Sequence, residues 1–132
     1  SKLGVIVFTN CIDGLALSIC NSIFHTFKTI EEKFTETKKG EDYSIYQGYY
    51  TSRWGDDAFT DLNGNLVGYT LNTFNPLEDH NLFKPYQNNE HTFFTDEGDG
   101  IGVNGEPWEF IIKDGRVTLV KVASMELTPY NF

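Results

Sequence analysis

The chain has 132 residues and a net charge of −9 at pH 7, with 39% hydrophobic and 22% charged residues. This composition predicts a folded protein, and the length suits one domain with a core of its own. The negative charge argues against binding to nucleic acid or to anionic membranes, because both are recognised by clustered Lys and Arg.

The charge is distributed unevenly along the chain. Residues 1–40 carry five Lys and four acidic residues, whereas residues 41–132 carry five basic and fifteen acidic residues. A polar, Gly-containing stretch over residues 35–42 separates the two parts and is typical of a linker. The chain is already in an apolar run at Leu3, and so abrupt a start suggests a piece cut from a longer protein. We therefore expect residues 1–40 to be a strand–helix remnant of an upstream domain plus a linker. Residues 41–132 are expected to form a separate domain.

The first part is predicted to contain a strand and then a helix. The run from Leu3 to Phe8 is apolar on both faces and rich in β-branched residues, which favours a strand covered on both sides. The stretch from Leu15 to Phe27 has helical periodicity, with an apolar side that includes Ile19 and Ile23, and Asp13 could cap its N-terminus. These two elements cannot cover their own apolar faces. Their cover must come from the second part, a second copy of the chain or another domain.

The second part is predicted to be an antiparallel sheet. Asn63-Gly64 separates residues 58–62 from 65–74, and Asp114-Gly115 separates residues 108–113 from 116–122. Both dipeptides favour two-residue hairpin turns. A first strand is expected to carry Tyr46, Tyr50 and Trp54 on one face, and further strands are expected over residues 81–86, 91–95 and 125–127.

The predicted fold class is therefore mostly β. Six to eight short strands suggest a small antiparallel β-barrel or sandwich, preceded by a strand and an α-helix. The aromatic content of 15% favours the barrel, because large side chains fill the few interior positions of a small barrel.

Two apparent ligand motifs are better explained as loops. Residues 100–105 match G-x-G-x-x-G, but Glu106-Pro107 leads from them into a strand instead of the helix that a dinucleotide fingerprint requires. Residues 61–65 begin like a calcium loop. Leu66 stands where that loop needs Gly, so a hairpin accounts for these residues better.

No metal, cofactor or catalytic site is expected. His25, His80 and His91 share no ligand spacing, and Cys11 and Cys20 form no C-x-x-C pair. Two buried thiols are favoured over a disulfide, although both remain open. No Ser is followed three residues later by Lys, and no G-x-S-x-G is present, so no nucleophile is assigned.

Three aromatic residues are candidates for a ligand site. Tyr50, Trp54 and Trp108 are predicted to line the barrel interior, where they either fill the core or contact a small apolar ligand.

The order of several short motifs resembles one protein family. The opening from Lys2 to Asn10, with a turn and the helix after it, resembles the last strand and helix of a serine β-lactamase-like hydrolase, of the class C β-lactamase and penicillin-binding-protein-like type. The second part of the chain resembles the lipocalin-like C-terminal β-barrel domain that many of these hydrolases carry. The matching segments are Tyr46-Gln47-Gly48-Tyr49-Tyr50, Gly64-Asn65-Leu66, Leu82-Phe83-Lys84-Pro85-Tyr86, Phe93-Phe94, Glu106-Pro107-Trp108-Glu109-Phe110 and Asp114-Gly115-Arg116-Val117-Thr118.

The resemblance implies a non-catalytic accessory domain that shapes substrate access or assembly. Its partner would be the upstream catalytic domain of the same polypeptide, and no catalytic motif of the family has a matching position here. Two alternatives remain open. One is a barrel that binds a small apolar ligand, and the other is a homo-oligomerisation module that pairs through the segment from Leu3 to Phe8.

Overall fold

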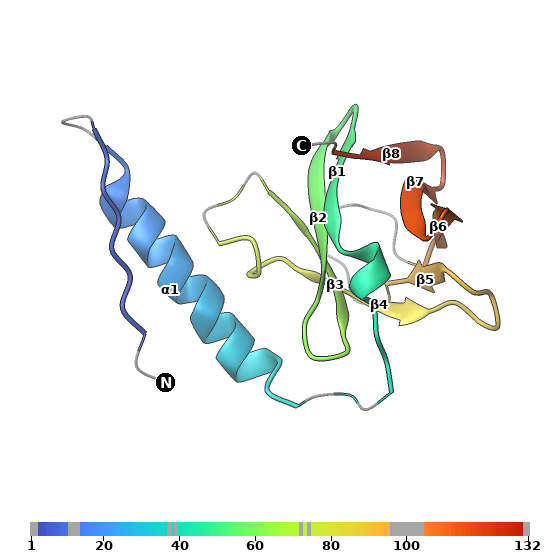
Figure 1. The fold of residues 1–132 in the computed structure, drawn as a ribbon, viewed down its shortest axis with the longest axis horizontal. Helices are drawn as coiled ribbons and strands as arrows, with labels where there is room; N and C mark the ends of the chain where they lie inside the picture. The colour runs from blue at the N-terminus through green and yellow to red at the C-terminus, as the bar shows by residue number, and fades with distance from the viewer. Residues whose placement is uncertain are drawn as a thin grey trace.

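The computed structural model describes residues 3–10, 14–36, 38, 40–71, 73, 75–95 and 105–130. Eight antiparallel strands close into a barrel in their order along the chain, and one α-helix precedes them (Figure 1). The prediction of a mostly-β fold with a small antiparallel barrel is therefore confirmed. The elements are α1 (Ala16–Lys33), the 3₁₀ turn η1 (Ser44–Tyr46), β1 (Gly48–Ser52), β2 (Gly55–Asp61), β3 (Leu66–Thr70), β4 (Asn81–Pro85), β5 (Thr92–Phe94), β6 (Trp108–Lys113), β7 (Arg116–Val122) and β8 (Met125–Pro129).

Both predicted hairpin turns are present. Asn63 and Gly64 have φ angles of 56° and 77°, and Asp114 and Gly115 have φ angles of 51° and 72°. Two successive positive φ angles define the type I′ turn, whose twist matches that of the strands it joins. Strands β6 and β7 have the predicted bounds, whereas β3 ends at Thr70, four residues earlier than predicted.

The predicted strand from Leu3 to Phe8 is wrong, because no strand forms over residues 3–10. A strand needs a neighbour for its backbone N–H and C=O groups, and the barrel closes on itself without this segment. Figure 1 shows it running back along α1, far from the strands.

The helix is longer than predicted. It continues six residues past Phe27 to Lys33. Ile30 extends the apolar side, and Lys28 Nζ lies 3.7 Å from Glu32 Oε1, an ion pair across one turn of the helix. Leu15 occupies the N-cap position without a side-chain cap, and the proposed cap Asp13 lies outside the described residues. Within the described ranges, no helix is long and apolar enough to cross a membrane.

Two apolar clusters stabilise the molecule. The larger one fills the barrel and is mostly aromatic. The smaller one lies on the outer wall, where Phe34 packs with Val67 and Leu77 and joins the end of α1 to the barrel.

Candidate functional site

Aromatic side chains fill the barrel interior. Tyr50 and Trp108 are 2% and 1% exposed, and both contact Phe59, with ring centroids 5.3 and 5.9 Å apart. Phe83 and Phe110 extend this edge-to-face packing, at 5.3 Å from Trp108 and 5.1 Å from Phe59 respectively. Such contacts are typical of a packed core. The structure thus brings two of the three candidate ligand residues together, inside a core already occupied by side chains.

Trp54 does not join the other two residues. It lies in the turn between β1 and β2 and is 72% exposed, with the Arg53 guanidinium 4.7 Å from its ring centroid. The expected alternation of Tyr46, Tyr50 and Trp54 fails because β1 ends at Ser52. The Ser52 hydroxyl accepts a hydrogen bond from the Trp54 backbone N–H at 3.1 Å, which fixes the turn.

One end of the barrel is closed by η1. The Tyr46 hydroxyl lies 2.7 Å from Nδ1 of His91, and the Tyr50 hydroxyl donates to the Tyr46 carbonyl oxygen at 2.9 Å. Burial raises the pKa of Tyr50 to about 12 and also raises the pKa of Tyr46. Phenols with raised pKa values stay protonated at neutral pH and are poor bases. Their hydrogen bonds and their place in the aromatic cluster hold η1 over this end of the barrel.

The carboxyl group of Asp57 lies toward the β1–β2 turn. Burial raises the pKa of Asp57, which accepts a hydrogen bond from the Thr70 hydroxyl at 3.1 Å. The indole N–H of Trp108 is buried and has no hydrogen-bond partner among the residues that the structure describes. Over the described part of the chain, no three His, Cys, Asp or Glu side chains come together as metal ligands.

The predicted loops agree with the structure where it describes them. The Asp61 carboxylate accepts hydrogen bonds from the backbone N–H groups of Gly64, at 2.7 Å, and Tyr43, at 2.9 Å. It therefore organises the hairpin. Gly105 leads through Glu106 and Pro107 into β6, as expected, while residues 100–104 lie outside the described residues.

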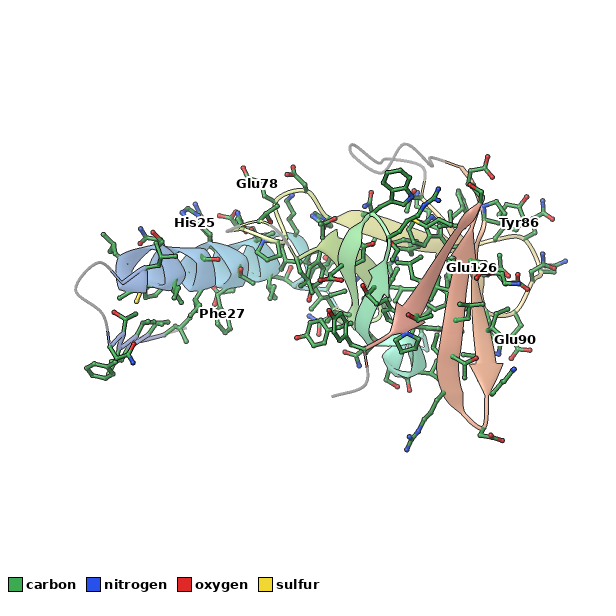
Figure 2. All side chains as sticks on the ribbon, turned by 90° about the horizontal axis from the view of Figure 1, so that it is seen from above. His25, Phe27, Glu78, Tyr86, Glu90 and Glu126 are labelled. Carbon is green, nitrogen blue, oxygen red and sulfur yellow. The ribbon has the colours of Figure 1, made fainter. Side chains whose placement is uncertain are left out.

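The most unusual surface belongs to the N-terminal part, which we call the arm (residues 3–10 and 14–27). These residues include no Asp, Glu, Lys or Arg, although such residues make up 22% of the chain. Figure 2 shows that α1 projects away from the barrel, with His25 and Phe27 on opposite sides of it. No residue of α1 is buried. The arm contributes eight of the twelve large hydrophobic residues that the described structure exposes: Leu3, Ile6, Phe8, Leu15, Leu17, Ile19, Phe24 and Phe27.

Several contacts connect the end of α1 to the barrel, and we call this region the joint. Phe34 is 5% exposed and meets the His80 ring edge-on at a centroid distance of 5.3 Å. The Asn63 side chain donates to the Phe34 carbonyl oxygen, and Lys38 N–H donates to the Asn63 carbonyl oxygen at 2.9 Å. The barrel therefore fixes the direction in which α1 projects.

Sequence reasoning identified the apolar side of the helix but missed the joint. Phe34 and His80 are 46 residues apart, and no local pattern links them. The absence of charge over the arm was visible in the sequence and could have marked it as a surface to be covered.

Compared with known proteins, the chain matches no family model, no curated protein and no solved structure.

Proposed function

We propose that this chain is a non-catalytic accessory domain that docks through its arm onto a catalytic domain, encoded upstream in the same polypeptide. The resemblance carried by the ordered sequence motifs suggests that this partner is a serine β-lactamase-like hydrolase. In that setting the barrel would shape substrate access to the catalytic domain or support assembly.

The observation that carries the proposal is the absence of charge from the exposed, apolar arm. Ile6, Phe8 and Leu17 are 80%, 91% and 74% exposed. The fully buried centre of a protein interface is depleted of charged residues, and burying apolar surface contributes about 25 cal/mol per Å². A surface of this kind is favourable in a complex and unfavourable in water.

The rigid joint supports the same role. Because Phe34, Val67 and Leu77 anchor the end of α1 on the barrel wall, a partner that binds the arm also sets the position of the barrel. An accessory domain that controls access to a neighbouring site needs such a fixed connection.

The packed interior argues against the ligand-binding alternative. Tyr50 and Trp108 are already in contact with other aromatic rings, and a ligand would have to displace them. Tryptophan fluorescence titrated with fatty acids and aromatic compounds tests this alternative. A saturable response lost on replacing Trp108, but kept on replacing Trp54, would favour a ligand-binding barrel over the accessory domain.

The homo-oligomer is the second candidate. Residues 3–10 pair with no strand of the barrel, so this segment could pair with its copy in a second chain. Light scattering over a wide concentration range separates the two candidates. A monomer favours the accessory domain, whereas a dimer that the double variant Ile19→Glu/Phe24→Glu converts to monomers favours self-association. The matched control is Ile45→Glu, which places a charge on an exposed apolar residue outside the arm.

Catalysis by the chain itself would contradict the proposal. The decisive observation would be hydrolysis of a chromogenic ester or β-lactam by the purified chain, at a rate abolished by replacing one of its own residues.

A further inference from the structure

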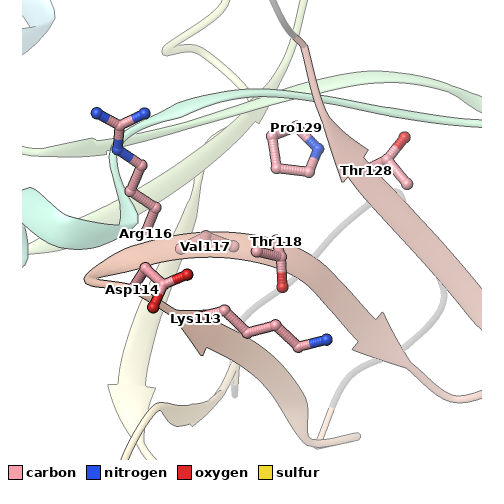
Figure 3. A pocket seen from close by; sticks show the side chains of 7 residues that line it. All are labelled: Lys113, Asp114, Arg116, Val117, Thr118, Thr128 and Pro129. Carbon is pink, nitrogen blue, oxygen red and sulfur yellow. The ribbon is translucent and has the colours of Figure 1, made fainter.

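The barrel wall contains a groove where β8 passes from one neighbouring strand to the other. Strand β8 pairs with β7 only at Val120–Val122. It pairs with β1 through Thr128 and Pro129, and the Tyr130 N–H then donates to the Tyr49 carbonyl oxygen at 2.8 Å. Arg116, Val117 and Thr118 of β7 lie beyond the last residue that β8 covers. The resulting groove has a volume of about 840 Å³ and is shown in Figure 3.

A bulge explains why the wall opens here. Ile111 pairs with Leu119 and Ile112 with Val117, so Thr118 has no partner on β6. The Thr118 hydroxyl donates to the Ile111 carbonyl oxygen at 3.2 Å. Such a bulge increases the local twist of its strand. Beside it, Pro129 has no N–H with which to continue a ladder.

The side chains around the groove give it a distinct chemistry. Lys113 and Arg116 are paired in the register of the β6–β7 hairpin, and Figure 3 shows their side chains extending in different directions from it. Both are exposed, and neither forms an ion pair with another described residue. Asp114 also lines the groove, which leaves one net positive charge in a protein whose total is −9. Val117 and Pro129 supply the apolar lining.

We propose that this groove binds an extended, acidic peptide segment of a partner protein as an added strand on β7. Arg116 pairs with Lys113 beside the two-residue turn, so its backbone groups are bonded to β6. The backbone groups of Val117 and Thr118 would pair with the peptide backbone, over about 7 Å at 3.3 Å per residue. Lys113 and Arg116 would pair with its carboxylates. This proposal is independent of the docking role of the arm.

Charge and backbone together select this occupant. A second copy of the same hairpin would bring two further cations close to Lys113 and Arg116, which is unfavourable. A small anion would satisfy the two cations but would leave the backbone groups of β7 uncovered. Both are therefore outcomes that the test must distinguish.

The test uses nuclear magnetic resonance of the ¹⁵N-labelled chain. The probe is an acetylated and amidated pentapeptide of alternating Glu and Val. We expect saturable shifts of the backbone amides of Arg116, Val117 and Thr118 at millimolar peptide. The same peptide with N-methylated backbone amides, a peptide with Lys in place of Glu, and glutarate are each expected to bind at least about tenfold more weakly.

Paired variants test the role of the two cations. Lys113→Glu/Arg116→Glu is expected to weaken binding of the acidic peptide by about tenfold or more and to favour the Lys peptide instead. The control Arg53→Glu/Lys121→Glu makes the same change of charge on a different groove and should leave binding unchanged.

Three results would overturn the proposal. Shifts confined to residues outside the groove, or no shift at all, would exclude the site. Equal affinity for glutarate or for the N-methylated peptide would indicate a simple anion site. Concentration-dependent shifts of the same amides without any peptide would indicate self-association.

Discussion

The side chain of Asn63 donates a hydrogen bond to the backbone carbonyl oxygen of Phe34, the C-cap residue of α1. The two residues are 29 positions apart, and their contact ties the β2–β3 turn to the helix. The backbone carbonyl oxygen of Asn63 also accepts a hydrogen bond from the Lys38 N–H. The direction of the arm therefore depends on a hairpin that also belongs to the barrel.

Replacing Gly64 should destabilise both the β2–β3 turn and its connection to the end of α1. Gly64 has φ +77°, and a Cβ atom there would lie 2.7 Å from the Lys38 carbonyl oxygen. Gly115 has φ +72° with open space around it, so Gly115→Ala reports the backbone strain alone, about 1–2 kcal/mol. Urea unfolding should show a larger loss for Gly64→Ala than for Gly115→Ala. Equal losses would mean that the contact with Lys38 contributes nothing.

The joint should weaken in acid because of His80. Burial lowers the pKa of His80 from its usual 6.5, and its Nδ1 lies 2.8 Å from the Leu77 carbonyl oxygen. A lowered pKa means that the unfolded chain binds the proton more readily, so this contribution to stability is complete above pH 6.5 and decreases as the pH falls below it. Unfolding measured between pH 7.5 and 5 should show this decrease, and His80→Gln should reduce it. An unchanged pH profile in His80→Gln would contradict this role.

The local features of the fold could be predicted from the sequence. Asn63-Gly64 and Asp114-Gly115 located two hairpins because their turns need positive φ angles. The Asp114-Gly115 turn also placed β6 and β7 with their correct bounds. Residues 3–10 were assigned wrongly because an apolar, β-branched run has strand propensity, whereas a strand also needs a neighbour.

The site required the three-dimensional structure. Trp54 was predicted to be an interior residue, but β1 ends at Ser52 and leaves it in an exposed turn. The contact between Tyr46 and His91 joins residues that are 45 positions apart in the sequence. The groove at β7 depends on where β8 changes neighbour, which no local pattern encodes.

Alkaline conditions should destabilise the barrel through its buried phenols. The pKa of Tyr50 is raised by burial, and that of Tyr43 by burial and the nearby Glu41, each from 10 to about 12. The folded state therefore holds these protons more tightly, and stability decreases as the pH rises from 10 toward 12. Tyr50→Phe should make this decrease shallower, as measured by circular dichroism at increasing pH. It should also lose the hydrogen bond to the Tyr46 carbonyl oxygen, a cost of about 1 kcal/mol at neutral pH. An unaltered alkaline slope would mean that Tyr50 does not titrate with unfolding.

The aromatic interior should account for most of the barrel's stability. Phe110 is 2% exposed and contacts four other aromatic rings, so Phe110→Ala should lower the free energy of unfolding by about 3–5 kcal/mol. Trp54→Ala removes a larger side chain from the surface and should change it by less than about 0.5 kcal/mol. A large loss on removing Trp54 would show that this exposed residue has a structural role.

The docking role of the arm is tested most directly by the reactivity of Cys20, which is a free, half-buried thiol on α1. In a Cys11→Ser background, maleimide labelling of Cys20 is measured in this chain and in a polypeptide in which the proposed catalytic domain precedes it. The proposal predicts labelling at least about tenfold slower in the longer polypeptide, and recovery of the faster rate with Ile19→Glu/Phe24→Glu. Equal labelling rates in the two proteins would contradict it.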